Sequence, residues 1–349
     1  MAMVYNVNES ATQILAAKQV KENIFLDLVH RNGYGVTQQE ETNVSTLRMM
    51  KVLPITDDAR QLGAGVNGAE GTNGGWFDGS NGGKIGTPKV VEYDLNLLYI
   101  YDKPIDIPEV QEDMVPVNVM DNTTKNIGGR VATEINASTL ALQLVEKYAA
   151  AKTATKWDGN AVIVGDNAYT AVLNASNMLD EGDEENGIQM FPFAERQILM
   201  RPSFRTSLLS TSGVLVGGSN YAQSRLAKGV VSPEARKEWG NMYCGELDNV
   251  PCYIVPPAIW NRAGAWVGDT TAFNATEAIV CAASATDRGI STQDYIKIID
   301  CPDGAGKRLQ PKTRWGVKVC YPKGIVPILK KGTAAPSKDL KVFAVGSKA

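Results

Sequence analysis

The most regular pattern of apolar residues lies between residues 122 and 155, which read NTTKNIGGRVATEINASTLALQLVEKYAAAKTAT. The apolar side chains fall on two adjoining stripes at helical spacing, which together make a wide face for burial. The first stripe holds Ile127, Val131, Ile135, Leu142 and Val145, and the second holds Leu140, Leu144 and Tyr148. A helix of about 30 residues would be ~45 Å long at 1.5 Å per residue. The pattern therefore predicts a structural spine rather than an ordinary short helix.

Three shorter stretches also predict helices. Residues 10–30 have apolar positions close to helical spacing, which indicates one or two short helices on an N-terminal arm. Residues 166–179, DNAYTAVLNASNML, predict a second amphipathic helix. Residues 196–209, RQILMRPSFRTSLL, predict a short strand that turns into a helix at Pro202, because proline at the first helical position costs no hydrogen bond.

Extended segments flank a glycine-rich stretch near the start of the chain. Residues 45–55 and 89–110 are rich in β-branched and other apolar residues, and the second segment is interrupted by Pro104 and Pro108. Between them, residues 62–86 contain ten glycines in 25 positions. Two extended segments around such a tip predict a long hairpin.

Later segments alternate turns with apolar strands. Residues 245–260 predict a turn leading into a strand, residues 275–286 predict another strand, and residues 294–332 predict two or three more, separated by Gly and Pro turns. No fixed-period repeat is present, which argues against a solenoid or a propeller.

Composition places the chain among ordinary globular proteins, whereas the distribution of charge is uneven. Of its 349 residues 44% are hydrophobic, and the formal net charge is −3. Residues 301–349 carry eleven Lys or Arg against Asp303 and Asp339, so this segment is +9 and the first 300 residues are −12. A bipolar chain can associate with copies of itself or face an anion such as packaged nucleic acid. A solvated basic tail without a partner is the alternative.

Cysteine and histidine usage excludes several classes of site. The five cysteines are widely spaced and never form C-x-x-C, so the sequence predicts neither a zinc site nor a disulfide framework. His30 is the only histidine, which removes most Ser-His-Asp and Cys-His systems, and we expect it to close a helix. No secretion signal and no run of 18 apolar residues occurs, so we expect no membrane association.

The glycine-rich stretch contains a G-x-G-x-x-G pattern at Gly63, Gly65 and Gly68. A dinucleotide site needs a strand before the first glycine and a helix after the third, and more glycine follows here instead. A soluble nucleotide-binding oxidoreductase is therefore a poor alternative, and we expect no cofactor.

The apolar residues Trp76, Phe77 and Ile85 argue against a plain flexible linker in the glycine-rich stretch, because large apolar side chains gain nothing from exposure to water. They indicate a tip that docks on another surface.

An acidic cluster, DEGDEE at residues 180–185, lacks the spacing of a calcium loop and is interpreted as a solvated loop. No P-loop, G-x-S-x-G or H-E-x-x-H pattern is present. We therefore expect neither a catalytic residue nor a metal ligand, and no enzyme activity.

In its order of segments the chain resembles the major capsid proteins of tailed bacteriophages, of the Hong Kong ninety-seven type. Local support comes from FPFAERQILMRPSFRTSLL, which is similar to the strand-then-helix element of that family's axial domain. GELDNVPCYIVPPAIW is similar to the family's glycine turn into the next strand, and TRWGVKVCYPKGIVPILKK to its closing peripheral-domain strands.

The resemblance implies an α+β fold and the division of the chain into segments. These are an N-arm (1–45), an extended β-hairpin loop (46–108), a peripheral domain with a spine helix (109–157), an axial domain (158–289), returning peripheral strands (290–331) and a C-terminal tail (332–349). In this family the extended loop lies over a neighbouring subunit, so the loop-tip residues become contact candidates: Trp76, Phe77, Lys84 and Ile85. Some members form a covalent cross-link through a lysine on this loop; Lys84 and Lys89 lie in the right region, but no partner residue can be assigned. Anion or neighbour contacts are expected at Lys307, Arg308, Lys312 and Arg314.

The resemblance also implies a function and partners. The chain would be a coat protein that assembles in the host cytoplasm into hexamers and pentamers of an icosahedral virion shell around double-stranded DNA. A separate scaffolding protein, a portal and possibly decoration proteins would be partners, and contact with packaged DNA would be nonspecific in sequence. An encapsulin-like nanocompartment, which has the same fold but holds an enzyme cargo, is the alternative within the fold.

Overall fold

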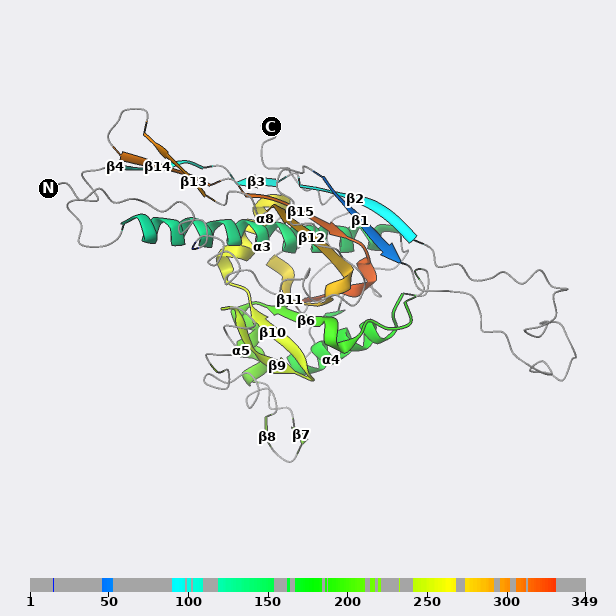
Figure 1. The fold of residues 1–349 in the computed structure, drawn as a ribbon. Helices are drawn as coiled ribbons and strands as arrows, with labels where there is room; N and C mark the ends of the chain where they lie inside the picture. The colour runs from blue at the N-terminus through cyan, green and yellow to red at the C-terminus, as the bar shows by residue number, and fades with distance from the viewer. Residues whose placement is uncertain are drawn as a thin grey trace, which may run out of the picture.

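The computed structural model describes residues 46–52, 90–97, 99–101, 103–108, 119–153, 162–163, 167–183, 186, 188–210, 214–216, 219–220, 241–267, 274–291, 296–301, 306–311 and 313–330, with Leu15 and Ser232. A long helix runs through the molecule, with small sheets along one side and a larger sheet with two helices on the other (Figure 1). The expected α+β fold is present.

The long helix is α3, Val119–Thr153, whose 35 residues make a rod of ~52 Å at 1.5 Å per residue. The predicted spine helix is therefore confirmed and is somewhat longer than expected. Six of the eight stripe residues are buried, whereas Leu142 is only partly buried, and the Tyr148 side chain lies outside the described set.

The middle of α3 is buried around almost its whole circumference. It packs against α8 (Pro257–Val267), β15 (Thr313–Val319), β16 (Ile325–Leu329) and the turn η6 (Pro322–Gly324). Polar side chains are consequently buried with the apolar stripes, and they are Thr124, Asn136, Ser138, Thr139, Gln143 and Lys147. The apolar pattern alone did not predict them.

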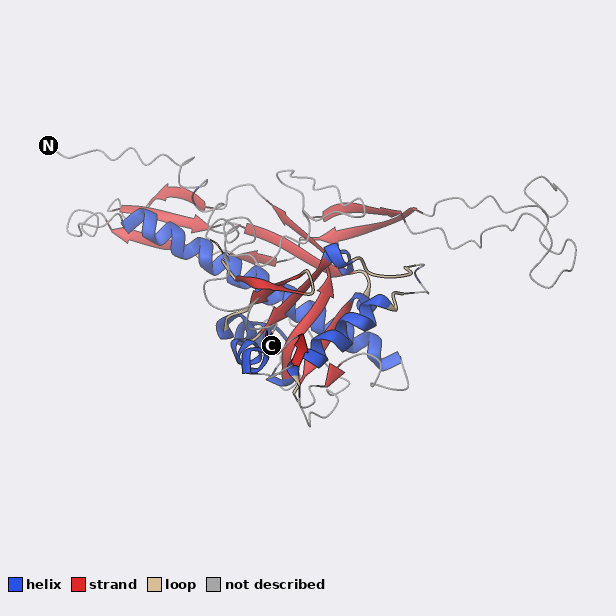
Figure 2. Cartoon of the chain, turned by 90° about the horizontal axis from the view of Figure 1, so that it is seen from below, coloured by secondary structure: helices blue, strands red, loops and turns tan. Residues whose placement is uncertain are grey.

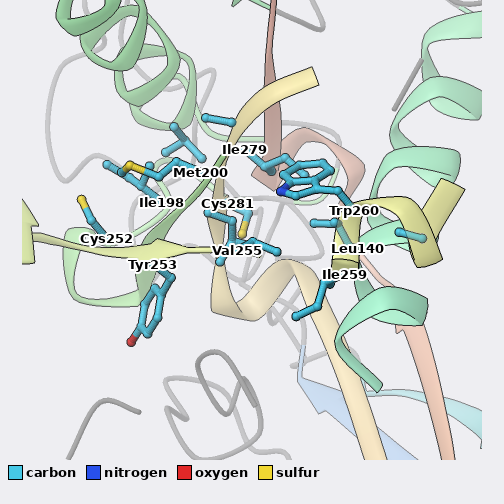
Figure 3. Close-up of a cluster of buried hydrophobic side chains, with 14 of the residues drawn as sticks. Leu140, Ile198, Met200, Cys252, Tyr253, Val255, Ile259, Trp260, Ile279 and Cys281 are labelled. Carbon is cyan, nitrogen blue, oxygen red and sulfur yellow. The ribbon is translucent and has the colours of Figure 1, made fainter. Parts of the chain in front are cut away.

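The larger sheet has six strands in the order β5-β16-β11-β6-β10-β9. These strands are β5 (Val162–Ile163), β6 (Arg196–Met200), β9 (Tyr243–Leu247), β10 (Val250–Ile254), β11 (Thr276–Ala282) and β16. β6 pairs in parallel with β10 and antiparallel with β11, and β16 pairs in parallel with β5. Figure 3 shows part of the core beside this sheet, where Trp260 of α8 and Leu140 of α3 lie near Ile279 and Cys281 of β11.

Local sequence signals explain the helices and the turn around this sheet. Helix α4, Ala168–Asp180, begins after Asn167, whose side chain accepts hydrogen bonds from the N–H groups of Tyr169 (2.8 Å) and Thr170 (3.3 Å). Helix α5, Pro202–Ser210, starts at the proline that the sequence indicated. Asp248 and Asn249, with φ of 50° and 62°, form the two-residue turn between β9 and β10.

Two three-stranded sheets join the early part of the chain to its later part. The first has the order β12-β15-β3, with β12 at Thr286–Ser291 and β3 at Tyr99–Tyr101. The second has the order β13-β14-β4, with β13 at Ile296–Asp300, β14 at Gly306–Pro311 and β4 at Ile105–Pro108. Of the strands in the predicted 290–331 segment, β13, β14 and β15 lie in these small sheets, while β16 joins the six-stranded sheet. The segment boundaries themselves remain predictions.

The extended hairpin has its two flanking strands as expected. β1, Thr46–Val52, pairs antiparallel with β2, Val90–Asn96, in an unbroken register from Thr46 opposite Asn96 to Val52 opposite Val90. Figure 1 places this pair at one end of the molecule and β4, β13 and β14 at the other, and the turned view of Figure 2 shows the same elongated outline. A further short pair, β7 (Val214–Val216) and β8 (Ser219–Asn220), completes the described strands.

Candidate functional site

The contact residues expected at the loop tip lie outside the described residues. These are Trp76, Phe77, Lys84 and Ile85, and the same holds for Lys89, for the Gly63 to Gly68 pattern, for His30 and for Lys312. Their roles stay predictions from the sequence.

Lys307, Arg308 and Arg314, the other expected contact residues, are on strands at the small sheets. Arg308 of β14 donates from Nε to Oδ1 of Asp106 on β4 at 2.6 Å and from Nη2 to Oδ2 at 2.8 Å. This two-point pairing lowers the pKa of Asp106 below its usual value. Lys307 forms an ion pair with Asp300 on the neighbouring strand β13, and Arg314 lies partly buried on β15.

Basic side chains nearer the end of the described chain also have acidic partners. Nζ of Lys323 lies 3.1 Å from Oδ1 of Asp183, and Nζ of Lys330 lies 3.3 Å from Oε1 of Glu277. Four cations of the basic segment therefore pair with carboxylates of the same chain. The excess positive charge expected there from the sequence is partly neutralised before any partner binds.

The acidic cluster at residues 180–185 is not simply a solvated loop, in contrast to the sequence interpretation. Asp183 is only 2% exposed. Its N–H donates to the carbonyl of Ile188 at 2.6 Å, and its Oδ2 accepts from Nδ2 of Asn186 at 2.7 Å. The interpretation as a solvated loop was wrong for Asp183, because a run of acidic residues does not indicate which of them is buried in a turn.

Arg196, the first residue of β6, holds this region together from inside. Its side chain is fully buried, and its Nε and Nη2 donate to the carbonyl of Phe191 at 2.9 and 2.6 Å. Nη1 donates to the Ser176 hydroxyl at 2.8 Å, and Nη2 donates to Oδ1 of Asp180 at 2.5 Å. A buried guanidinium with this many acceptors fixes the segment between α4 and β6, because leaving any of its donors unpaired would be costly.

Two large apolar side chains are exposed in the segment that precedes Arg196. Met190 is 46% exposed and Phe193, in the turn η4 (Phe193–Glu195), is 45% exposed; no other large hydrophobic side chain of the described residues is so exposed. The guanidinium carbon of Arg196 lies 4.0 Å from the centroid of the Phe193 ring. One face of this ring therefore rests on a cation, an arrangement that stabilises its position.

Lys147 of α3 is a buried cation with a strongly shifted pKa. It is buried, and its Nζ donates to the carbonyl of Pro322 at 3.0 Å. Burial, with a further contribution from the nearby Lys323 cation, lowers its pKa to about 8, while Asp183 acts in the opposite direction. No sequence signal distinguished this lysine from the exposed ones.

No group of three or more His, Cys, Asp or Glu residues that could hold a metal ion occurs in the described part of the chain. Burial raises the pKa of the Cys281 thiol to about 12 and also raises that of Cys252, so neither is an activated nucleophile. No described helix is long and apolar enough to cross a membrane.

Comparison with solved structures places the fold. A structure from Mycobacterium phage Bobi is similar to this chain over 90% of its length and over 91% of the phage chain, with a TM-score of 0.50 and 13% sequence identity. The expected fold, that of phage capsid structures, is confirmed. The Hong Kong ninety-seven type remains a prediction.

Two further structures are similar at lower scores. The bacteriophage PhiM1 mature capsid has a TM-score of 0.47 and 12% identity, covering 83% of each chain. A virus-like particle from Pyrococcus furiosus has a TM-score of 0.44 and 13% identity, covering 91% of this chain and 98% of that one. No protein-family model and no curated protein matches the sequence.

Proposed function

We propose that this chain is the major capsid protein of a tailed phage, a structural subunit that associates with copies of itself into a closed head shell. The observation that carries the proposal is the shared fold with the phage Bobi structure over nine tenths of both chains. The order of segments in the sequence supports it independently. We infer a structural rather than an enzymatic role.

The elongated shape suits a tile that contacts several neighbours at once. The β1–β2 pair lies at one end and the sheet of β4, β14 and β13 at the other, and α3 connects them as a stiff rod (Figure 1). In the proposed division, residues 46–108 form the extended loop and residues 158–289 the axial domain. Specific interfaces bury roughly 1,200–2,000 Å² each, and several moderate interfaces per subunit sum to a stable shell.

Partners beyond the shell itself belong to the same proposal. A scaffolding protein, a portal, decoration proteins and packaged DNA are expected from the resemblance. Contact with DNA would be nonspecific and weakened by salt. Since Lys307 and Arg308 already face carboxylates of their own chain, we expect their contribution to DNA binding to be modest.

Negative-stain electron microscopy of the protein, expressed alone and with a candidate scaffolding protein, tests the proposal. We expect closed particles of uniform size, and nucleic acid rather than an enzyme inside particles recovered from infected cells. A compact monomer under every condition would overturn the shell function, and an enzyme cargo would favour a nanocompartment.

A further inference from the structure

The segment of residues 188–196, here called the Phe193 platform, exposes apolar surface that the other described residues do not cover. Met190 and Phe193 project from it and are nearly half exposed, whereas Phe191 between them is fully buried. An exposed aromatic ring on a fixed element is a typical anchor of a protein interface.

The Phe193 platform is held rigid from three directions. Arg196 donates to the Phe191 carbonyl from inside, and the Phe191 N–H donates to the carbonyl of Leu179 at the end of α4 at 3.1 Å. Gly182 packs so tightly beneath it, at φ 68°, that an added Cβ would lie 2.3 Å from the carbonyl oxygens of Ile188 and Gln189. A surface ordered before binding loses little conformational entropy when it binds.

The surroundings of the Phe193 platform are acidic. Asp180, 39% exposed in its side chain, and the exposed Glu181 end helix α4 beside it. Including the buried Asp183 and Glu195, four described carboxylates lie in this region with three cations, Arg196, Lys323 and the buried Lys147, which leaves a net charge of −1. A partner surface should therefore combine positive charge with side chains that cover an aromatic ring.

The N-terminal half of α3 offers such a surface. Its exposed side chains there are Asn122, Lys125, Asn126 and Arg130. Lys125 and Arg130 lie on either side of Asn126, and neither has an acidic partner among the described residues. Their aliphatic stems can cover apolar surface while their charges face carboxylates, and a guanidinium can stack on a ring.

This surface cannot meet the Phe193 platform of its own chain. Asp183 lies beside Lys323, and the adjoining Pro322 carbonyl accepts from Lys147, so the platform is near the C-terminal half of α3. Lys125 and Arg130 precede Lys147 by 22 and 17 residues, which on a straight helix is roughly 33 and 25 Å. The partner that brings such a surface to the platform is another copy.

We propose that the Phe193 platform docks on the exposed N-terminal half of α3 in a second copy of this chain. The inference rests on the proposed function and names one of its interfaces. Because the two surfaces differ, the contact is head-to-tail, and contacts of this kind close into rings when the rotation between copies allows it. The rings would be the pentamers and hexamers of the shell.

The test uses the full-length chain and measures association by sedimentation velocity over a range of protein concentrations. Phe193→Ser with Met190→Ser should weaken association on the order of 30-fold, the loss typical of a central anchor. Glu181→Lys and Arg130→Glu should each weaken it at low salt, and the double variant should regain wild-type association because each interface again pairs opposite charges. Lys297→Glu, which reverses an exposed charge on β13, is the matched control.

The outcomes separate this inference from the shell proposal. If the wild type builds shells and the Phe193, Glu181 and Arg130 variants, with unchanged circular dichroism, build them equally well, the docking inference is wrong and the shell function stands. If the wild type forms only small rings that require Phe193, the docking stands and the shell function fails. A wild type that stays monomeric at every concentration overturns both.

Discussion

The indole nitrogen of Trp315 on β15 donates a hydrogen bond of 2.8 Å to the hydroxyl of Ser138 on α3. Both side chains are buried, and the Ser138 hydroxyl donates onward to the carbonyl of Ile135 at 2.9 Å. The long helix and the small sheet are thus joined by a polar contact inside an apolar interface. Such a contact fixes the rotational position of the helix, because alternative positions would leave the buried N–H unpaired.

Ser138→Ala should destabilise the protein by about 1–3 kcal/mol, because it removes the acceptor of a buried indole N–H. The measurement is the free energy of unfolding from urea denaturation. Ser207→Ala, at an exposed serine in α5 whose hydroxyl donates to the carbonyl of Ser203 at 3.2 Å, is the matched control and should change stability by less than about 0.5 kcal/mol. Equal effects of the two substitutions would contradict the assigned role of Ser138.

Substitution of alanine for two different glycines should change the stability of the protein in opposite directions. At Gly182 the positive φ and the 2.3 Å approach of two carbonyl oxygens leave no room for a Cβ, so Gly182→Ala should cost more than about 2 kcal/mol. At Gly129 in α3 nothing lies within 4 Å of the added atom, so Gly129→Ala should stabilise by up to about 1 kcal/mol. Thermal unfolding of both variants measures these two effects. A stabilised Gly182→Ala variant would contradict the close packing of the Ile188 and Gln189 carbonyls on Gly182.

The pH dependence of stability should carry a contribution from Lys147. Its pKa of about 8 in the folded protein lies below the ordinary 10.5, so the folded state disfavours the protonated form. Above pH 10.5 Lys147 is neutral in both the folded and the unfolded chain, and the protein has its full stability. As the pH falls from 10.5 to about 8, protonation of Lys147 favours the unfolded chain and the free energy of unfolding decreases. Below about pH 8 this loss is complete. Lys147→Met should therefore be more stable than the wild type by on the order of 2 kcal/mol at pH 7, and this advantage should shrink toward pH 10.

Comparison of variant with wild type at each pH removes the contributions of other groups that titrate in the same range, such as Cys281. Lys297→Met, at an exposed lysine on β13, is the matched control and should change stability at pH 7 by less than about 0.5 kcal/mol. A constant difference between Lys147→Met and the wild type from pH 7 to 10 would mean that Lys147 does not titrate as described.

The loop-tip prediction can be tested although the tip lies outside the described residues. Trp76→Ala with Phe77→Ala should leave the circular dichroism of the monomer largely unchanged and lower the yield of assembled particles, because these rings are expected to pack on a neighbour. Particle yield by sucrose-gradient sedimentation is the measurement. Assembly equal to that of the wild type would count against the docking role of the tip.

Elements with strong local signals were predictable from the sequence. The two apolar stripes predicted the spine helix, Asn167 and Pro202 begin α4 and α5, and the Asp248–Asn249 turn precedes β10. Each of these depends on residues within a few positions of one another. The fold class was predicted from the family resemblance that their order suggested.

Pairings between distant residues were not predictable in the same way. Nothing local indicates that Val162 lies opposite Ile328, or that Arg308 reaches Asp106 across about 200 residues of sequence. The buried charges Arg196, Asp183 and Lys147 were missed for the same reason, since their burial depends on segments that approach only in the folded chain. Part of the Phe193 platform lies in the FPFAERQILM stretch that resembles phage capsid proteins, but the exposure of Phe193 depends on the folded structure.

Strand β16 is the last described strand of the chain, yet it lies inside the six-stranded sheet, so the sheet cannot be completed until that late strand has been synthesised. β16 lies between β11 and β5, so β11, which supplies an inner strand of the largest sheet, lacks one of its two neighbours until Leu329 has been made. Fragments that stop short of this strand expose a hydrogen-bonding edge and cannot present finished surfaces to other copies. In the proposed shell, only chains translated through that point would be complete enough to serve as subunits.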